Sequence, residues 1–258
     1  MNNYQHIQVE LSEYVAVLTM NSPPYNFIDE HMLGEMLNAL QQLEEDPNCR
    51  CVVLASSGSA FCAGADFKSS LAEGADLDEF TKRFYSTAMK LFEFGKPMVA
   101  AVEGAAVGAG FGITLLADFR VVSQGATMSA NFNRLGIHPG FGMSVTLPRL
   151  VGEHNAALLF YTGRRIKGAE AAKLGLVTQL VDPGEALNGA VSLAKQIALS
   201  SPLAVQHTRA TVRASLLATI RDANRHEQAI QAQEMLTEDF KEGVLAASER
   251  RDPRFKGV

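Results

Sequence analysis

The spacing between hydrophobic residues changes several times along the chain, and each change marks the start of another predicted helix or strand. Residues 6–11 and 14–20 are short runs of β-forming residues, and residues 51–55 are wholly apolar, so all three are predicted strands. Between them, apolar residues recur every three or four positions from Asp29 to Leu43, which predicts an amphipathic helix. The chain therefore begins in the order strand, strand, helix, strand.

The alternation continues to about residue 150. A predicted helix at 78–94 is followed by a strand at 98–102, a glycine-rich turn, a helix at 109–117 and a strand at 119–123. Strands that alternate with helices are typical of βαβ units with a largely parallel sheet. The pattern predicts an α/β fold.

Beyond residue 150 the strand signal nearly disappears. One strand is predicted at 176–181, whereas the remaining periodic segments are helical and comprise residues 153–161, 168–174, 184–199, 202–216 and 218–250. Ser200, Ser201 and Pro202 have the order of a helix cap followed by proline in the first turn. We expect a β/α core over residues 1–195 and a helical region over residues 196–258.

Composition narrows the class of protein. The 258 residues are 47% hydrophobic and 20% charged, which suits a packed core and excludes a disordered chain or a small disulfide scaffold. The net charge is −5, and the 23 Lys and Arg residues are scattered rather than gathered into the basic stripe that a phosphate backbone requires. No nucleic-acid partner is expected.

The spacing of the cysteines and the first ten residues indicate the cellular compartment in which the protein is expected. Cys49, Cys51 and Cys62 match neither a zinc site nor a redox pair, so we expect buried free thiols, no metal and a reducing compartment. Residues 1–10 lack the pattern of a signal peptide, which favours the cytoplasm. Residues 97–117 would nearly span a bilayer but contain a glutamate and four glycines, so we interpret them as strand, turn and helix, with no membrane association.

Two glycine-containing turns, residues 56–67 and 103–112, each follow a predicted buried strand and lead into a helix. Helix N-termini present unpaired N–H groups at this edge of an α/β sheet. Two such turns side by side could aim two N–H groups at one oxygen and form an oxyanion hole. The alternative is that the glycines only permit tight turns and close packing. The spacings match no P-loop, dinucleotide-binding fingerprint or serine-hydrolase elbow.

Five segments carry a family resemblance: AFCAGADF (60–67), AAVEGAAVGAGFGITLLAD (100–118), RLGIHPGFG (134–142), RRIKGAEAAKLGLVTQLV (164–181) and EDFKEGVLAASERRDPRFKG (238–257). Together they resemble the enoyl-CoA hydratase/isomerase, or crotonase, superfamily over essentially the whole chain. The resemblance implies a crotonase-like ββα spiral core, a helical C-terminal trimerisation region, and a homotrimer or dimer of trimers. It also implies an acyl-CoA thioester as the partner, with coenzyme A as part of the substrate and no separate cofactor.

The resemblance implies site residues position by position. The oxyanion-hole N–H groups fall on Ala65 and Ala109, which would hold a thioester carbonyl as it becomes an enolate. Tyr85, on the predicted 78–94 helix, is expected to form pocket wall rather than to act as an acid. The full set expected to bind the acyl and coenzyme A groups is Pro24, Tyr25, Ala63, Ala65, Asp66, Phe67, Lys68, Gly108, Ala109, Phe132, Phe255 and Lys256.

The family's acidic residues are missing from this chain. The two hydratase glutamates fall on Gly112 and Phe132, and the single isomerase acid falls on Gly140. Because glycine and phenylalanine cannot accept a proton, two-glutamate hydration is not expected. His138 is the only histidine in these segments and the candidate acid or base, with a loop histidine bonded to a backbone carbonyl as the alternative.

The expected function is therefore an acyl-CoA-processing enzyme of this family. Its stabilised thioester enolate is compatible with isomerase or β-keto-acyl-CoA hydrolase-type chemistry. The alternatives are a catalytically weak acyl-CoA-binding homologue and a structural subunit of a degradation assembly.

Overall fold

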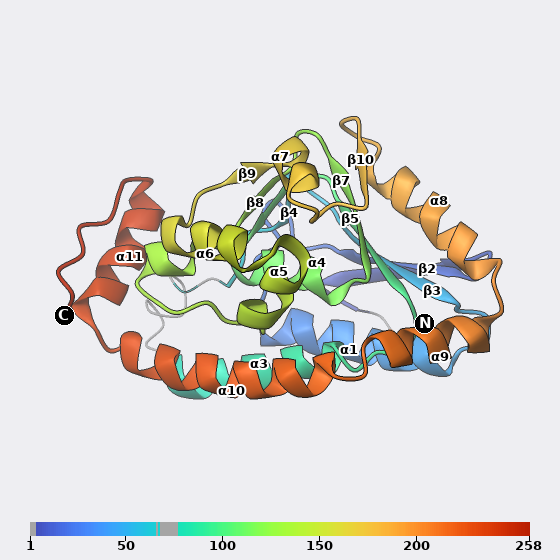
Figure 1. Cartoon of the computed structure of the whole chain (residues 1–258), viewed down its shortest axis with the longest axis horizontal. Coiled ribbons are helices and arrows are strands. Elements are labelled where there is room, and N and C mark those ends of the chain that lie inside the picture. Colours follow the sequence, from blue (N-terminus) through green and yellow to red (C-terminus); the bar gives the residue numbers. More distant parts are fainter. Residues whose placement is uncertain (1–3, 66, 68–76) are drawn as a thin grey trace.

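The computed structural model describes residues 4–65, 67 and 77–258 (Figure 1). Two mixed β-sheets form the centre of the molecule, and helices pack around them. The α/β class predicted from the alternation of strands and helices is confirmed.

The larger sheet contains the six strands that the sequence predicts. They follow the order β1 (Ile7–Ser12), β2 (Val15–Met20), β3 (Cys51–Ser56), β5 (Met98–Val102), β7 (Phe119–Ser123) and β10 (Gln179–Val181). The first pair is an antiparallel hairpin and all later neighbours are parallel. β10 is shorter than predicted because Leu176 N–H bonds Ala171 O, 3.0 Å away, and thus closes the preceding helix.

The smaller sheet was not predicted. Its strands are β4 (Ala60–Cys62), β6 (Ala105–Val107), β8 (Thr127–Ser129) and β9 (Ile166–Lys167), of which only the last is antiparallel to its neighbour. Each has two or three residues, too few for hydrophobic spacing to reveal a strand. β4 and β6 lie inside the two glycine-containing turns, and their pairing of Ala60 with Ala105 brings those turns side by side.

Most helices lie where hydrophobic spacing predicts them. They are α1 (Glu30–Glu45), α3 (Leu77–Leu91), α4 (Ala109–Leu116), α5 (Met143–Val151), α6 (Glu153–Thr162), α7 (Gly168–Lys173), α8 (Ala186–Ala198), α9 (Pro202–Val212), α10 (Leu216–Glu234) and α11 (Glu238–Glu249), with a 3-10 helix, η1 (Asn131–Leu135). The predicted helical stretch 218–250 is divided, because Thr237 Oγ1 accepts from Phe240 N–H at 3.1 Å and caps a new helix. α5 contains Pro148 and was missed.

Two hydrophobic clusters fill the molecule. On one face of the larger sheet, α8 buries an alanine every four residues, at positions 186, 190, 194 and 198, against Val53, Val99 and Val121. The larger cluster joins α1, α3 and α4 to Ile220 of α10 and Phe240 of α11. In Figure 1, α10 runs along one long side of the molecule, where it packs on α3. The C-terminal helices thus contribute to the same core as the sheets.

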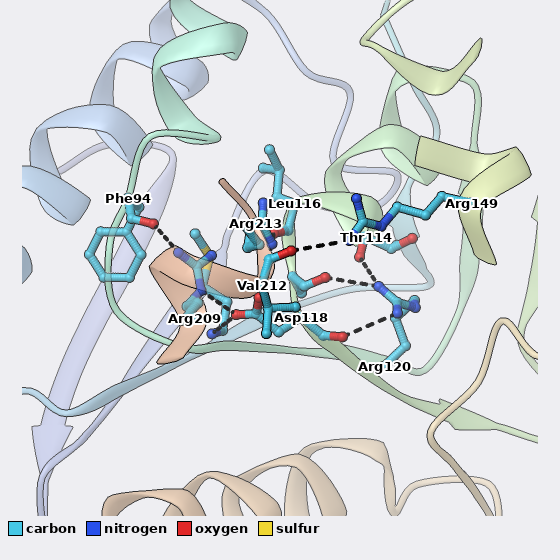
Figure 2. Close-up of polar contacts among 11 residues, drawn as sticks. Phe94, Thr114, Leu116, Asp118, Arg120, Arg149, Arg209, Val212 and Arg213 are labelled. Carbon is cyan, nitrogen blue, oxygen red and sulfur yellow. Dashed lines mark hydrogen bonds and ion pairs between the residues drawn. The ribbon is translucent and has the colours of Figure 1, made fainter. Parts of the chain in front are cut away.

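Buried ionic contacts attach α9 to the sheet (Figure 2). Asp118 lies between α4 and β7. Its Oδ2 accepts from Arg209 Nε at 2.8 Å and from Met98 N–H at 2.9 Å, and its Oδ1 accepts from Arg213 Nη1 at 2.9 Å. These three charged side chains are only 10–17% exposed. Arg120 beside them donates to four backbone carbonyls, and burial lowers its pKa to about 10.

The three cysteines are free and buried, as predicted. Burial raises the pKa of the Cys49 thiol to about 11 and that of Cys51 and Cys62 to about 12. In the described part of the chain, no helix is both long and apolar enough to cross a membrane.

Candidate active site

The two glycine-containing turns meet at a very close approach of their backbones. A Cβ on Gly64 would lie 2.9 Å from Val107 O and 3.8 Å from Ala109 N. A Cβ on Gly110 would overlap Cys62 O and lie 2.8 Å from Cys62 C. The glycines therefore do permit close packing, as the alternative in the sequence analysis expects, and that packing places Ala65 and Ala109 beside one cavity.

A cavity of about 40 Å³ lies between the turns and α3. The described residues that line it are Ala63, Gly64, Ala65, Phe67, Phe80, Thr81, Phe84, Tyr85, Gly108, Ala109, Asn131, Phe132 and Leu135. Six residues expected to bind substrate are thus brought together: Ala63, Ala65, Phe67, Gly108, Ala109 and Phe132. The walls are mainly apolar, as suits an acyl group.

The backbone N–H groups of Ala65 and Ala109 lie outside the regular hydrogen-bond ladders. Ala65 forms an isolated parallel bridge with Ile28, in which Ile28 N–H donates to Gly64 O at 3.0 Å, so the Ala65 N–H is not used by that bond. Ala109 is the first residue of α4, and a first-turn N–H has no partner within its own helix. Two donors from separate segments thus border the same cavity.

Asn26 fixes the loop before α1 against this site, and sequence reasoning missed it. It is fully buried with φ 49°, and its Oδ1 accepts from Ser22 N–H at 2.8 Å. Its Nδ2 donates to Ser57 O at 2.6 Å and Ala60 O at 2.9 Å. An asparagine in a proline-rich loop has no pattern that distinguishes this role from an ordinary turn.

Other residues expected to bind coenzyme A lie outside the cavity lining. Pro24 O accepts from Ser59 N–H at 3.0 Å, and Tyr25 is half exposed with its ring edge against Phe27, 6.0 Å between centroids. Asp66 and Lys68 fall outside the described residues.

The C-terminal tail folds back onto the start of α11. Lys256 N–H and Gly257 N–H both donate to the carboxylate of Asp239, each at 2.7 Å, and Phe255 is 40% exposed. Neither Phe255 nor Lys256 lines the cavity beside Ala65 in this single chain. Phe67, which does line the cavity, contacts α11: its ring packs edge-on against that of Phe240, with the ring centroids 5.7 Å apart.

The three positions at which the resemblance places acids hold no carboxylate, and the two glycines among them leave no room for a side chain. A Cβ on Gly112 would lie 2.7–2.9 Å from side-chain atoms of Phe141. Phe132 itself forms part of the cavity wall. A Cβ on Gly140 would overlap the hydroxyl of Tyr85 and lie 2.7 Å from its Cζ.

Tyr85 is the one titratable side chain among the described residues that line the cavity. It is 3% exposed and lies on α3. Burial raises the pKa of its hydroxyl, a hydrogen bond with Gln231 acts in the opposite direction, and the charge of Glu227 raises the pKa further. The phenol therefore remains protonated at neutral pH.

The structure does not bring His138 into the cavity beside Ala65 and Ala109. It lines a separate hollow with Ser144, Tyr161 and Glu234. Its Nδ1 lies 2.7 Å from Pro139 O, and its backbone N–H donates to Glu234 Oε2 at 2.5 Å. The ring contact to Pro139 O is the backbone-carbonyl contact that the alternative interpretation expects.

A buried polar network from α10 holds the segment that contains His138. Glu227 is fully buried and accepts from Gly142 N–H at 2.8 Å, Ser144 N–H at 3.0 Å and Ser144 Oγ at 2.6 Å. Burial raises the pKa of Glu227, against the effect of these hydrogen bonds. One helical turn later, Gln231 Nε2 donates to His138 O at 2.6 Å. The sequence shows α10 as amphipathic but not which polar residues face inward.

No group of His, Cys, Asp and Glu side chains within residues 4–65, 67 and 77–258 could hold a metal ion. The arrangement offers backbone donors, an apolar wall and a phenol.

Comparisons with known proteins cover nearly all of the chain. The family model described as Enoyl-CoA hydratase/isomerase matches residues 10–258. Enoyl-CoA hydratase EchA19 of Mycobacterium tuberculosis (strain ATCC 25618 / H37Rv) is 32% identical over 254 residues, which are 96% of this chain and 95% of that protein.

Solved structures show the same architecture. The enoyl-CoA hydratase/isomerase of Pseudoalteromonas atlantica T6c has a TM-score of 0.85 and 28% identity, covering 98% of this chain and all of that one. An enoyl-CoA hydratase of Mycobacterium avium subsp. paratuberculosis K-10 has a TM-score of 0.87 and 25% identity with the same coverage.

Proposed function

Because the chain belongs to the enoyl-CoA hydratase/isomerase (crotonase) family, we propose that it processes an acyl-CoA thioester through an enolate held by the N–H groups of Ala65 and Ala109. The observation that carries this proposal is that the two alanines, from separate segments, border one apolar cavity. Two preorganised donors at one oxygen stabilise negative charge that develops there.

The reaction proposed here is not two-glutamate hydration. Gly112, Phe132 and Gly140 supply no carboxylate, and side chains at Gly112 and Gly140 would collide with Phe141 and Tyr85. Isomerisation and hydrolysis of a β-keto-acyl-CoA both pass through a thioester enolate and suit the site better. His138 is the proton-transfer group that the sequence suggests, and from its place outside the cavity lining it would act through an intervening water.

The proposal extends to the coenzyme A group and the assembly. The half-exposed Tyr25 and Phe27 rings lie on the loop that Asn26 fixes beside Ala63, where they offer an aromatic surface to the coenzyme, together with Pro24, Asp66 and Lys68. Phe255 and Lys256 would cover the nucleotide, and the C-terminal helices would form a trimer or dimer of trimers. The free, buried cysteines favour a reducing compartment such as the cytoplasm.

A second candidate is an acyl-CoA-binding homologue with weak catalysis. It is favoured by the lack of any carboxylate among the described residues that line the cavity. A panel of CoA thioesters separates the two, with binding measured by calorimetry and products by mass spectrometry. We expect turnover of a 3-enoyl-CoA or 3-oxoacyl-CoA and little hydration of crotonyl-CoA. Binding without turnover would support the homologue, and absence of binding would refute both.

Ala109→Pro tests the oxyanion hole directly. Ala109 is the first residue of α4, where proline is well tolerated, and the substitution removes its N–H. We expect turnover to fall by about 10²–10³-fold, as when one oxyanion donor is lost. Glu153→Pro is the matched control, because Glu153 is exposed and also begins a helix after a glycine. Equal activity of the two variants would refute the role of Ala109.

A further inference from the structure

α3 places Tyr85 in the wall of the cavity that Ala65 and Ala109 also line. Tyr85 lines the same cavity as Ala65 and Ala109, and only 3% of it is exposed. Phe84 packs edge-on against its ring, with centroids 5.3 Å apart. Its hydroxyl occupies the space in which a side chain at position 140 would begin. The group is thus held in one place inside an apolar wall.

The hydroxyl is hydrogen-bonded in a way that leaves its own proton available. Tyr85 has a hydrogen bond with Gln231, whose Oε1 has no partner, so the amide Nε2 is the donor and the phenol oxygen the acceptor. The same Nε2 donates to His138 O at 2.6 Å, which fixes the amide. Within the described residues, no acceptor for the Tyr85 proton is found.

Burial and the charge of Glu227 raise the pKa of Tyr85 and keep it neutral, against the effect of its hydrogen bond with Gln231. Glu227 lies one turn before Gln231 on α10, fully buried, and its charge adds to the effect of burial on the pKa of Tyr85. A neutral phenol can donate a proton to a carbanion, but it cannot remove one from an α-carbon. The described cavity lining contains two kinds of donor, the backbone N–H groups and this phenol, and no side chain that serves as a base at neutral pH.

We infer that Tyr85 is the catalytic proton donor to the enolate and that the substrate class is a 3-oxoacyl-CoA, cleaved at the bond between its second and third carbons. The inference rests on the proposed function. Cleavage of that bond makes the enolate without removal of an α-proton, whereas isomerisation begins with such a removal.

The step balances with water as the second reactant. Water adds to the 3-oxo carbon to form a hydrate, and the bond between the second and third carbons breaks, leaving its electron pair in the thioester enolate and the former 3-oxo carbon as a protonated carboxylic acid. The enolate oxygen is held by Ala65 and Ala109 N–H. The electron pair of the enolate then takes the Tyr85 proton to form the new C–H bond, and the phenolate recovers a proton from the protonated carboxylic acid, which leaves as the neutral acid and ionises in water.

Tyr85→Phe removes only the hydroxyl. With acetoacetyl-CoA as substrate and acetyl-CoA as the measured product, we expect kcat to fall by about 10²-fold, the usual contribution of a general acid, with KM changed less than about threefold. Tyr161→Phe is the matched control, because it removes the same hydroxyl from a side chain that is 77% exposed. Full activity of Tyr85→Phe would overturn the inference.

Product stereochemistry gives a second readout. A 3-oxobutanoyl-CoA with methyl and ethyl groups on its second carbon has no exchangeable α-proton, and its cleavage product gains a stereocentre only when the enolate is protonated. We expect one enantiomer from the wild-type chain and from Tyr161→Phe. We expect a mixture from Tyr85→Phe, since water reaches the enolate from either face. A single enantiomer from Tyr85→Phe, formed at the wild-type rate, would overturn the assignment.

Gln231→Met tests positioning of the phenol and covers the case that Tyr85→Phe does not fold. The phenol remains but loses its donor, so we expect kcat to fall by about tenfold, within the range for a hydrogen bond worth about 1.4 kcal/mol, while the product stays a single enantiomer. An unchanged kcat would show that Gln231 does not position the phenol.

If the wild-type chain isomerises 3-enoyl-CoA but does not cleave 3-oxoacyl-CoA, the inference fails while the proposed function stands. If it turns over no thioester, both fail.

Discussion

The hydroxyl of Tyr85 and a side chain at Gly140 compete for the same space. A Cβ on Gly140 would overlap the Tyr85 hydroxyl and would lie 2.8 Å from Gln231 Nε2. A relative with an acid at the position of Gly140 would have to place a different residue, or a different rotamer, at Tyr85. Glycine at position 140 is therefore compatible with this position of Tyr85, and a larger residue there is not. The contact joins α3 to the segment before α5.

Gly140→Ala should lower the stability of the fold at this contact. The added methyl group displaces the phenol and Gln231, and overpacking of this kind costs about 1–3 kcal/mol of unfolding free energy. Urea denaturation measures the loss. Gly34→Ala is the control, because nothing lies within 4 Å of its Cβ on α1, and there alanine should maintain or raise stability. Equal denaturation midpoints for the Gly140 variant and the wild-type chain would show that Tyr85 can move at little cost.

Gly112→Glu should not produce a hydratase. The new side chain would start 2.7 Å from the ring of Phe141, which is fully buried and has little space to move. We expect a lower melting temperature and no measurable hydration of crotonyl-CoA by the usual absorbance assay. Hydration by this single variant would mean that the Phe141 ring can leave its place.

Asp118→Asn should loosen α9. Arg209 and Arg213 would lose their buried carboxylate, and breaking a buried pair by removing one partner costs about 3–5 kcal/mol. Denaturation should show the loss, and hydrogen exchange should show reduced protection of residues 202–212. Asp222→Asn is the control, since its pair with Arg225 is 69–77% exposed and such pairs contribute about 0–1 kcal/mol. Similar effects of the two variants would contradict the buried role of Asp118.

Glu227 should make stability fall as the pH rises. Because burial raises its pKa above the ordinary value of 4.5, the folded chain holds this proton at pH values where the unfolded chain has lost it. The unfolded state then binds fewer protons, so the stabilisation present below about pH 4.5 is lost as the pH rises through the folded pKa. Denaturation of the wild-type chain and Glu227→Gln between pH 4 and 8 isolates this group. Their difference should shift in favour of the variant with rising pH, and a constant difference would contradict the raised pKa.

His138→Ala distinguishes the two candidates for proton transfer. The contact between His138 and Gln231 uses the backbone carbonyl, which alanine retains. If Tyr85 donates the proton, turnover of acetoacetyl-CoA should change by less than about threefold, because no general acid is lost. A loss of about 10²-fold in steady-state assays would instead assign the acid or base role to the imidazole.

The sequence predicted the long elements, and its resemblance to the family named Ala65 and Ala109, which the structure brings to one cavity. Strands such as 51–55 and the helix from Asp29 to Leu43 have hydrophobic spacing strong enough to be recognised alone. The smaller sheet could not be recognised, because β4 and β6 have three residues each and exist only through pairing with one another. The roles of Asn26 and Glu227 were missed for a similar reason, since their partners lie 31–34 and 83–85 positions away.

By itself, the sequence determined the α/β class, the family and the absence of acids at positions 112, 132 and 140, because these depend on residue identity and local spacing. Only the tertiary structure decided which titratable group among the described residues lines the cavity. His138 and Tyr85 are 53 positions apart, and neither position reveals where its side chain lies. Packing of α10 against α3 and the segment before α5 turned the phenol inward and left the imidazole in another hollow. Long-range packing sets that outcome, and local sequence patterns do not encode it.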